Sequence, residues 1–312
     1  MKRIFISYLL LIPLIYPSAA NCAPVLEVTG KKHLFYLIAS NHLGSAPFKK
    51  NNQIEKILKI SNKFCFENHP SDAKTAANIK MALYAAPDGK QLQQSVGENI
   101  FRKLQAHIVS GSISTDELNM LSPYAAAGII NTSFKDYEIF QSSLKIEYSV
   151  DNYILKFIRN HQKQIVGIEQ KDVLLRSMHS VSDKEWRQYV ADALTMRDCI
   201  KCMHNFFARQ AESYHDVDDY EYAYGSIKSA YKTHPGMFSI YKKIFFTLRN
   251  KEMADAILSE QSNLVPCDVV VIGAGHFGGQ DGIVNLLRFQ GMNVRQLKAT
   301  SKKNPLYTEL PR

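Results

Sequence analysis

The chain has 312 residues, a hydrophobic fraction of 46% and a formal net charge of +9. That length allows one large domain or two small ones, and the hydrophobic fraction supports a substantial core. The lysines lie in short scattered pairs such as Lys31-Lys32 and Lys302-Lys303, which is typical of a solvated surface. We therefore expect no nucleic-acid partner, and five cysteines are too few for a disulfide-framework protein of this size.

The first twenty residues have the order of a signal peptide. Lys2 and Arg3 precede an apolar run from 4 to 16, and small residues at 18–20 follow Pro17. The apolar run is short for a membrane span, although an uncleaved anchor helix is the alternative. We expect residues 1–20 to be removed, and 21–312 to be an exported domain, periplasmic or secreted, with no stable membrane insertion.

Short β-like runs alternate with long helical ones along the chain. Runs rich in β-branched or aromatic residues predict strands, and Gly30 suggests a hairpin between the first two. Apolar residues at a spacing of three to four predict helices. The strands are expected at 25–28, 34–39, 63–67, 164–169, 267–273 and 293–297, and the helices at 73–85, 91–110, 122–131, 183–214, 216–232 and 234–262.

This order predicts an α/β fold with a mostly parallel central sheet. The helical segments 70–140 and 172–262 would form an extensive cap beside it. The run 267–273 is fully apolar, as expected of a strand buried on both faces. With a helix that starts at Gln280 or Asp281 and stops at Gly291, it forms a βαβ unit with strand 293–297. The last fifteen residues resemble a tail.

Cys199 and Cys202 are placed by helical spacing within the long helix 183–214. A local disulfide and two buried thiols are equally good interpretations. Haem attachment would need a histidine directly after the second cysteine, and zinc would need further ligands nearby. We expect neither.

Four expected strands are followed by residues of related chemistry. His42 follows 34–39, Glu67 ends 63–67, Glu169 ends 164–169, and His276 follows the last apolar strand. Ligands bind outside the carboxyl ends of parallel strands, so two histidines and two carboxylates are expected on one edge of the sheet. Such a set suits a divalent metal such as Mn, Co or Zn, or general acid–base chemistry.

The glycines near the end of the chain have two interpretations. Gly273 and Gly275 would let backbone approach a bound group, and Gly278-Gly279 would offer free N–H groups to an anion. The segment Gly273–Gly278 also fits the G-x-G-x-x-G dinucleotide fingerprint. Only 34 residues follow Gly278, and no acidic ribose ligand follows at the usual spacing, so dinucleotide binding is the weaker alternative.

The same residues carry a family resemblance. Gly273-Ala-Gly-His276, with the segment up to Gly291, resembles the second Gly-x-x-His motif of the TraB/GumN family, which includes the TIKI proteins. Ala39-Ser-Asn-His42 stands at the first motif, with alanine in place of glycine. Glu67, Ile168-Glu169-Gln170 and Arg249-Asn250 match further family positions, and the resemblance covers about 25–298.

The resemblance implies a fold shared with erythromycin-esterase-like and ChaN-like proteins, and an activity similar to that of metal-dependent proteases. We therefore expect a hydrolase that acts on a peptide or small-molecule acyl bond. His42 and His276 would hold the metal with Glu169 as a third ligand, Glu67 would be the general base, and Arg249 would stabilise negative charge. The alternative is a non-catalytic exported protein that binds haem or a peptide at the same edge.

Overall fold

The computed structural model describes residues 23–30, 34–44, 47–48, 51–69, 83–84, 89–108, 113–132, 144–213, 219–259 and 266–298. The signal peptide expected at 1–20, most of the helix expected at 73–85 and the tail lie outside these residues. Within them, no helix is long and apolar enough to cross a membrane.

One sheet of six strands organises the described part of the chain. The strands are β1 (Val25–Thr29), β2 (Leu34–Ser40), β3 (Lys63–Phe66), β4 (Gln164–Gly167), β5 (Val269–Gly273) and β6 (Asn293–Leu297). Their spatial order is β4-β3-β5-β2-β1-β6. The four strands β4, β3, β5 and β2 run parallel, and β1 is antiparallel to both β2 and β6. The predicted α/β fold with a mostly parallel sheet is confirmed.

The sheet lies between two pairs of helices, because its strands alternate apolar side chains to both faces. In β5, Val269 and Val271 join a cluster with α1 (Asn52–Ile60) and α8 (Val150–Asn160). Val270 and Ile272 join a second cluster with α14 (Leu248–Leu258) and α15 (Ile283–Phe289). A strand that is buried on both faces in this way is typical of a parallel sheet.

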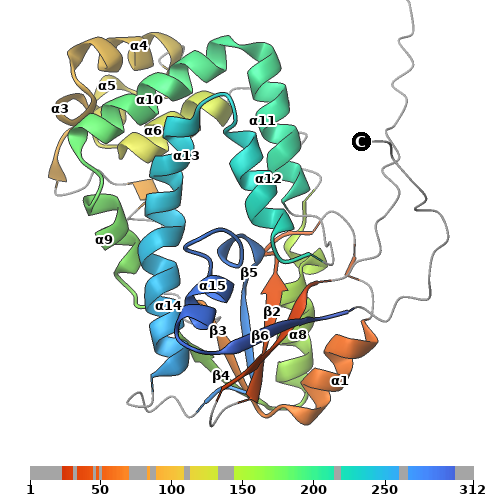
Figure 1. Cartoon of the computed structure of the whole chain (residues 1–312). Helices are drawn as coiled ribbons and strands as arrows, with labels where there is room; N and C mark the ends of the chain where they lie inside the picture. The colour runs from red at the N-terminus through yellow and green to blue at the C-terminus, as the bar shows by residue number, and fades with distance from the viewer. Residues whose placement is uncertain are drawn as a thin grey trace, which may run out of the picture.

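A separate helical part lies above the sheet in Figure 1, and the parallel strands point towards it. Its own core holds the single tryptophan, Trp186, among many aromatic side chains. The elements that border this core or connect it to the sheet are α3 (Leu92–Val96), α4 (Glu98–Ile108), α5 (Thr115–Asn119), α6 (Pro123–Thr132), η2 (Ile146–Tyr148), α9 (Val173–His179), α10 (Asp183–Asp198), α11 (Ile200–Glu212), α12 (Tyr222–Ala230), α13 (Pro235–Lys242) and η3 (Lys243–Thr247).

Two of the long predicted helices are broken. The helix expected at 91–110 divides into α3 and α4 at Gly97, whose φ of +82° favours glycine over other residues. The helix expected at 183–214 divides into α10 and α11 at Cys199, which has extended backbone. The prediction that both cysteines lie inside one continuous helix is therefore wrong. The helical spacing of apolar residues continues across the short break, so the sequence pattern does not reveal it.

The βαβ unit expected at the end of the chain is confirmed, but its last strand pairs with a different neighbour. β5 and β6 run in the same direction with α15 between them, but β6 pairs with β1 at the edge of the sheet rather than with β5. The cap of α15 is Gly282 rather than Gln280 or Asp281. Gly291 has a φ of +84° and follows the helix, as the sequence predicts.

Two disulfides are present among the described residues. Cys65 in β3 is joined to Cys267, just before β5, across 202 positions of sequence. Cys199 and Cys202 form the second, local bridge. Of the two interpretations of the local pair, the disulfide is the one that the structure contains.

Candidate functional site

The four predicted residues lie at the carboxyl ends of four neighbouring parallel strands. His42 follows β2, Glu67 follows β3 directly, Glu169 follows β4, and His276 lies in the short turn η4 (Ala274–His276) after β5. The order of the strands therefore brings together side chains that are far apart in the sequence. All four stand where ligands bind in open parallel sheets.

A cleft of about 200 Å³ opens between these strand ends and the helical part. His42, Glu67 and His276 line its sheet side, together with Arg249. Its other wall is largely apolar and comes from α11 to η3: Gln210, Ser213, Ala223, Ile227, Tyr241, Phe245 and Phe246. The cleft combines charged groups with an apolar wall, as small-molecule and peptide sites commonly do.

Gly273 marks the point where three of the polar groups converge. A Cβ atom on Gly273 would lie 2.9 Å from Oε1 of Glu67, and 3.6 Å from both Nε2 of His42 and Cδ2 of His276. The backbone N–H of Gly273 donates a hydrogen bond to Oε1 of Glu67. Glycine is required here for close approach rather than for an unusual backbone angle, since its φ is −53°.

Asn250 determines which ring nitrogen of His276 carries the proton. The Asn250 amide nitrogen donates to the carbonyl oxygens of Asp281, at 2.8 Å, and His276, at 3.4 Å. Its oxygen must therefore accept from Nδ1–H of His276. This leaves the lone pair on Nε2, which lies 3.8 Å from Oε1 of Glu67. Asn250 belongs to the pair that the family resemblance had singled out, but the sequence assigned it no function.

Asp151 has the same relationship with His42. Oδ2 of Asp151 accepts a 2.8 Å hydrogen bond from Nδ1 of His42, so Nε2 faces the other groups. The carboxylate lies in the first turn of α8, whose cap is Ser149, and the neighbouring Asn41 accepts from the N–H of Val150 at 3.1 Å. Asp151 is a site residue that sequence reasoning missed, since no motif links it to His42.

His42 and His276 have opposite protonation. Burial lowers the pKa of His276 to about 3, and the nearby positive groups add to this against the charge of Glu67, so His276 is neutral. Partial desolvation also disfavours a charged His42, but the hydrogen bond and charge of Asp151 and the charge of Glu67 raise its pKa to about 9. The His42 side chain is 66% exposed, so desolvation opposes its charge only weakly, and Asp151 and Glu67 set the upward direction of its pKa.

Glu67 is ionised at neutral pH although it is buried. Burial alone raises the pKa of a carboxyl group, but the two histidines, Arg249 and the Gly273 N–H lower the pKa of Glu67 to about 2. His276 contributes to this effect only at low pH, where its own ring is charged. The site thus has a fixed negative charge next to a neutral imidazole.

Arg249 is held mainly by Glu169. Its Nε donates to Oε1 of Glu169, and its Nη2 lies 3.1 Å from Oε2 of Glu169 and 3.4 Å from Oε2 of Glu67. Asn68 also donates to Oε2 of Glu169 at 3.2 Å. Both oxygens of Glu169 are therefore occupied, and this geometry does not favour Glu169 as a metal ligand.

The π-helical segment η3 positions the apolar wall and Arg249. The long helix expected at 234–262 runs as α13, η3 and α14, so one wider turn falls just before Arg249. In this turn the carbonyl oxygen of Phe245 accepts from Nη1 of Arg249 at 3.3 Å. The ring of Phe246 meets that of His276 edge to face with centroids 5.2 Å apart. Such π-turns are frequent at functional sites.

The donor set can be compared with what a divalent metal needs. In the described part of the chain, no three histidine, cysteine or carboxylate side chains are already arranged around one point as a metal site. The chemistry nonetheless fits, because both histidines direct Nε2 inward while their Nδ1 atoms are held by second partners, as in metal-ligating histidines. Nε2 of His276 has a free lone pair, and Nε2 of His42 would release its proton when a metal binds. The 3.8 Å between Nε2 of His276 and Oε1 of Glu67 is near the ~3.4 Å between two ligands of one tetrahedral ion.

Side chains of the protein itself fill the space next to the glycine loop at Gly278-Gly279. Oε2 of Glu221 accepts from the N–H of Gly279 at 3.0 Å. A Cβ on Gly278 or Gly279 would lie 2.5 Å from Glu221 or from the ring of Tyr224. The expected anion site at Gly278-Gly279 is therefore wrong, and the same contacts argue against the dinucleotide alternative.

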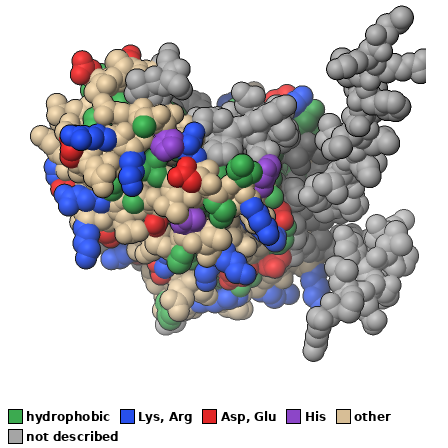
Figure 2. All heavy atoms as spheres, turned by 90° about the horizontal axis from the view of Figure 1, so that it is seen from above, with side chains coloured by type: hydrophobic (Ala, Val, Ile, Leu, Met, Phe, Trp, Pro, Cys, Tyr) green, Lys and Arg blue, Asp and Glu red, His purple; other side chains and the backbone are tan. Residues whose placement is uncertain are grey.

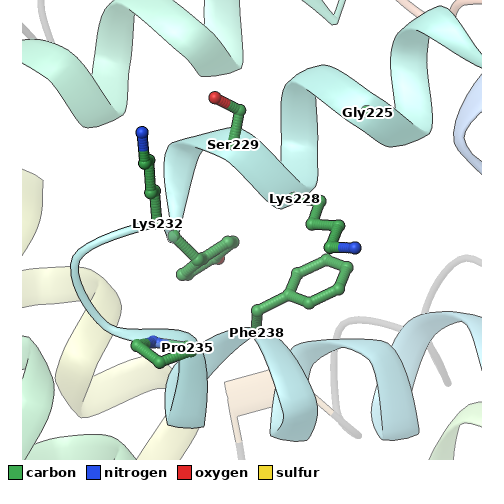
Figure 3. A pocket seen from close by; sticks show the side chains of 7 residues that line it. Gly225, Lys228, Ser229, Lys232, Pro235 and Phe238 are labelled. Carbon is green, nitrogen blue, oxygen red and sulfur yellow. The ribbon is translucent and has the colours of Figure 1, made fainter.

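A second cavity, of about 410 Å³, lies between α12 and α13 (Figure 3). It is lined by Tyr231, Pro235 and Phe238 with Lys228 and Lys232 at its border, and it contains no histidine or carboxylate. On the face shown in Figure 2, basic side chains occur in separate groups mixed with acidic ones. We therefore place the chemistry in the smaller cleft.

Comparison with known proteins supports the resemblance. The model of the TraB/PrgY/gumN family matches residues 24–296, so the chain belongs to that family. No curated protein and no solved structure matches it.

Proposed function

We propose that this member of the TraB/PrgY/gumN family is a metal-dependent hydrolase that cleaves a peptide bond or another acyl bond in the cleft above β5. The observation that carries the proposal is the convergence of Nε2 of His42, the His276 ring and Oε1 of Glu67 around Gly273. Two imidazoles and a carboxylate are the donors that Mn, Co and Zn accept.

In this proposal His42 and His276 hold the metal, and Glu67 lies beside them as the proton acceptor. A bound divalent ion would polarise the carbonyl group of the substrate and make water more acidic. Glu169 is no longer assigned as a ligand, because Arg249 and Asn68 occupy its oxygens. It acts instead by holding Arg249.

Glu67 would accept a proton from the attacking water. It is ionised at neutral pH, and its Oε1 faces His276. Arg249 would stabilise the negative charge that develops on the substrate, with the one N–H of its guanidinium that is not yet bonded to Glu67, Glu169 or Phe245. The aromatic wall formed by Tyr241, Phe245 and Phe246 would favour an apolar side chain next to the bond that is cleaved.

The test is metal analysis of the mature protein, followed by a peptide-library cleavage assay with Mn, Co or Zn. We expect metal-stimulated cleavage that Glu67→Gln lowers at least 100-fold, since one proton acceptor typically contributes about 10²–10⁴. Glu252→Gln is the matched control, because Glu252 pairs with Arg176 away from the cleft. Peptide or haem binding without cleavage under any of the three metals would favour the non-catalytic binding protein.

A further inference from the structure

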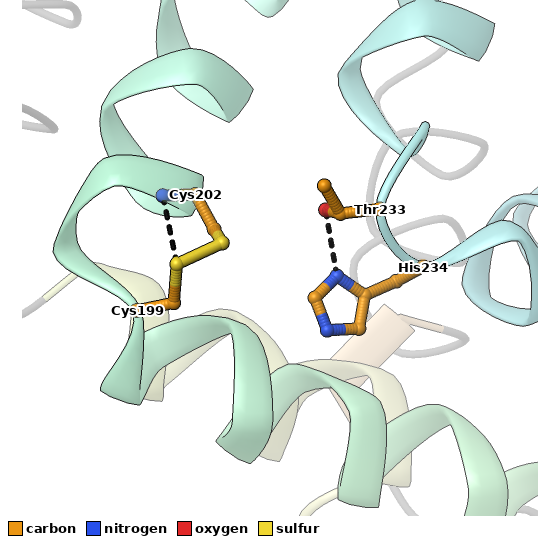
Figure 4. Close-up of a disulfide and its surroundings, with 4 residues drawn as sticks. All are labelled: Cys199, Cys202, Thr233 and His234. Atoms are coloured by element: carbon orange, nitrogen blue, oxygen red, sulfur yellow. Dashed lines mark hydrogen bonds between the residues drawn. A yellow bond between two sulfur atoms is a disulfide. The ribbon is translucent and has the colours of Figure 1, made fainter.

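The local disulfide lies at the start of a helix. Cys199 is the N-cap of the 13-residue α11, and Cys202 lies in its first turn. The backbone N–H of Cys202 donates to Sγ of Cys199 at 3.2 Å. Figure 4 shows the bridge at this junction between α10 and α11. The pair has this position because the long predicted helix breaks at Cys199.

Fold stability gives little reason for this bridge. A disulfide restricts the unfolded chain more when it closes a longer loop. The bridge between Cys65 and Cys267 spans 202 positions, whereas that between Cys199 and Cys202 spans three. The second bridge therefore constrains the unfolded chain much less.

The two bridges also differ in accessibility. Cys65 is only 2% exposed, in the core beside the sheet. Cys199 and Cys202 are both partly exposed, and Ile200 between them is 66% exposed. A thiolate from another molecule can therefore approach either end of the local bridge, whereas in the long-range bridge only the Cys267 end is partly exposed and the Cys65 end is shielded.

The surroundings of Cys199 favour a thiolate. Helix N-termini stabilise negative charge through their free N–H groups, and the N–H of Cys202 already points at the Cys199 sulfur. Lys201 adds an exposed positive charge, while Asp198, the acid next to Cys199 in the sequence, lies 3.7 Å from Arg197. Across from the bridge lie Thr233 and His234, which are hydrogen-bonded to each other at 2.9 Å (Figure 4).

We propose that Cys199 and Cys202 form a second chemical site, which exchanges its disulfide with a peptide or protein that carries two thiols. A substrate thiolate attacks Sγ of Cys199, the bond between Cys199 and Cys202 breaks, and the Cys202 sulfur leaves with the electron pair and takes a proton. The second substrate thiolate then attacks the substrate sulfur of the mixed disulfide and releases Cys199 as a thiolate. The substrate loses two electrons and two protons to form a disulfide, and the protein gains the dithiol.

The experiment uses the chain with Cys22→Ser, so that only the four bridged cysteines remain. The folded protein is mixed with a reduced synthetic peptide that carries two cysteines, and thiols are alkylated and mapped by mass spectrometry. We expect one peptide disulfide per chain, with Cys199 and Cys202 reduced and the Cys65–Cys267 bridge intact. The long-range bridge, with its buried Cys65, is thus the internal control. If both bridges stay oxidised, or if the long-range one is reduced as fast, the proposal is wrong.

Two single variants test the role of the helix. In Cys202→Ser the free Cys199 should react with glutathione disulfide at pH 6 at least tenfold faster than the free Cys202 of Cys199→Ser. An ordinary thiol with a pKa of about 8.5 is almost wholly protonated at that pH, so equal, slow rates in the two variants would overturn the proposal. The measurement does not depend on hydrolysis in the cleft, and the two proposals can fail separately.

Discussion

Nδ1 of His42 donates a 2.8 Å hydrogen bond to Oδ2 of Asp151, which lies 109 positions later in the sequence. The contact joins the loop after β2 to the first turn of α8. It directs Nε2 of His42 towards Gly273 and keeps the imidazole protonated in the metal-free protein.

Asp151→Asn should remove a stabilising contribution that depends on pH. The pKa of His42 is raised in the fold from 6.5 to about 9. The pair therefore contributes its full stabilisation of the fold below pH 6.5, and this stabilisation is lost as the pH rises through 9. In protein treated with a chelator, urea unfolding should show the variant less stable at pH 6 and equal to the wild type at pH 10. The difference should stay below about 1 kcal/mol because the ring is exposed. A deficit that is the same at both pH values would contradict the assignment.

His276→Gln should make the protein less sensitive to acid. The pKa of His276 is lowered to about 3 in the fold, so between pH 6.5 and 3 the unfolded chain binds a proton that the folded chain does not. Thermal melts of the wild type at pH 7 and pH 5 should therefore differ more than those of the variant. His161→Gln is the control, since His161 is exposed and only contacts its own helix.

His276→Ala should also destabilise the fold. The sequence places His276 on an exposed edge, where truncation would cost little, but the residue is only 6% exposed and contacts Asn250 and Phe246. We expect a loss of roughly 1–3 kcal/mol of unfolding free energy, because the buried Asn250 loses its partner. An unchanged denaturation midpoint would show that the side chain is not packed as described.

Gly273→Ala should impair activity because its methyl group would lie 2.9 Å from Oε1 of Glu67. The carboxylate must shift, and its hydrogen bond with the Gly273 N–H cannot keep its geometry. We expect at least a tenfold loss of hydrolysis. Gly128→Ala is the control, since nothing lies within 4 Å of its Cβ, and alanine should stabilise α6 by about 0.4–1 kcal/mol. Full activity in Gly273→Ala would show that the active site does not lie at Gly273.

Arg249→Met should lower the unfolding free energy by about 3–5 kcal/mol at pH 7, because it leaves the buried charges of Glu67 and Glu169 without their common partner. Arg176→Met is the control, since Arg176 pairs with Glu252 but is 39% exposed, and we expect about 1 kcal/mol or less. Chemical denaturation measures both. Similar losses of unfolding free energy in the two variants would mean that burial does not make the Arg249 ion pairs more important for stability than the Arg176 pair.

Replacing both Cys65 and Cys267 with alanine should destabilise the protein by about 5 kcal/mol, as a loop of some 200 residues implies. The same change at Cys199 and Cys202 should lower stability by about 2 kcal/mol at most, and should leave hydrolysis and metal content per folded molecule unchanged. Loss of bound metal in the second variant would show that the cleft depends on the local bridge.

The sequence predicted the arrangement of the site where chemistry follows a strand directly. His42, Glu67, Glu169 and His276 each come within three residues of the end of a strand, and the parallel sheet then brings these ends to one edge. The expected likeness to erythromycin-esterase-like and ChaN-like proteins stays a prediction.

The parts that the sequence did not predict depend on contacts without a local pattern. Asp151 reaches His42 only because α8 packs beside the sheet. The breaks at Gly97 and Cys199 fall inside continuous helical periodicity, and the pairing of Cys65 with Cys267 depends on β3 and β5 being neighbours. The occupation of Glu169 by Arg249 likewise follows from the turn at η3 and not from the residue types.

The central position of β5 has a consequence for how the molecule folds. β5 lies between β2 and β3, yet it follows β3 by some 200 residues of chain. Pairings of such high contact order form slowly and late, because a long loop must close before they gain any contact energy. A growing or truncated chain that ends before β5 has a divided sheet and does not yet contain His276, which follows β5. Any chemistry that needs both histidines therefore begins only in the finished chain.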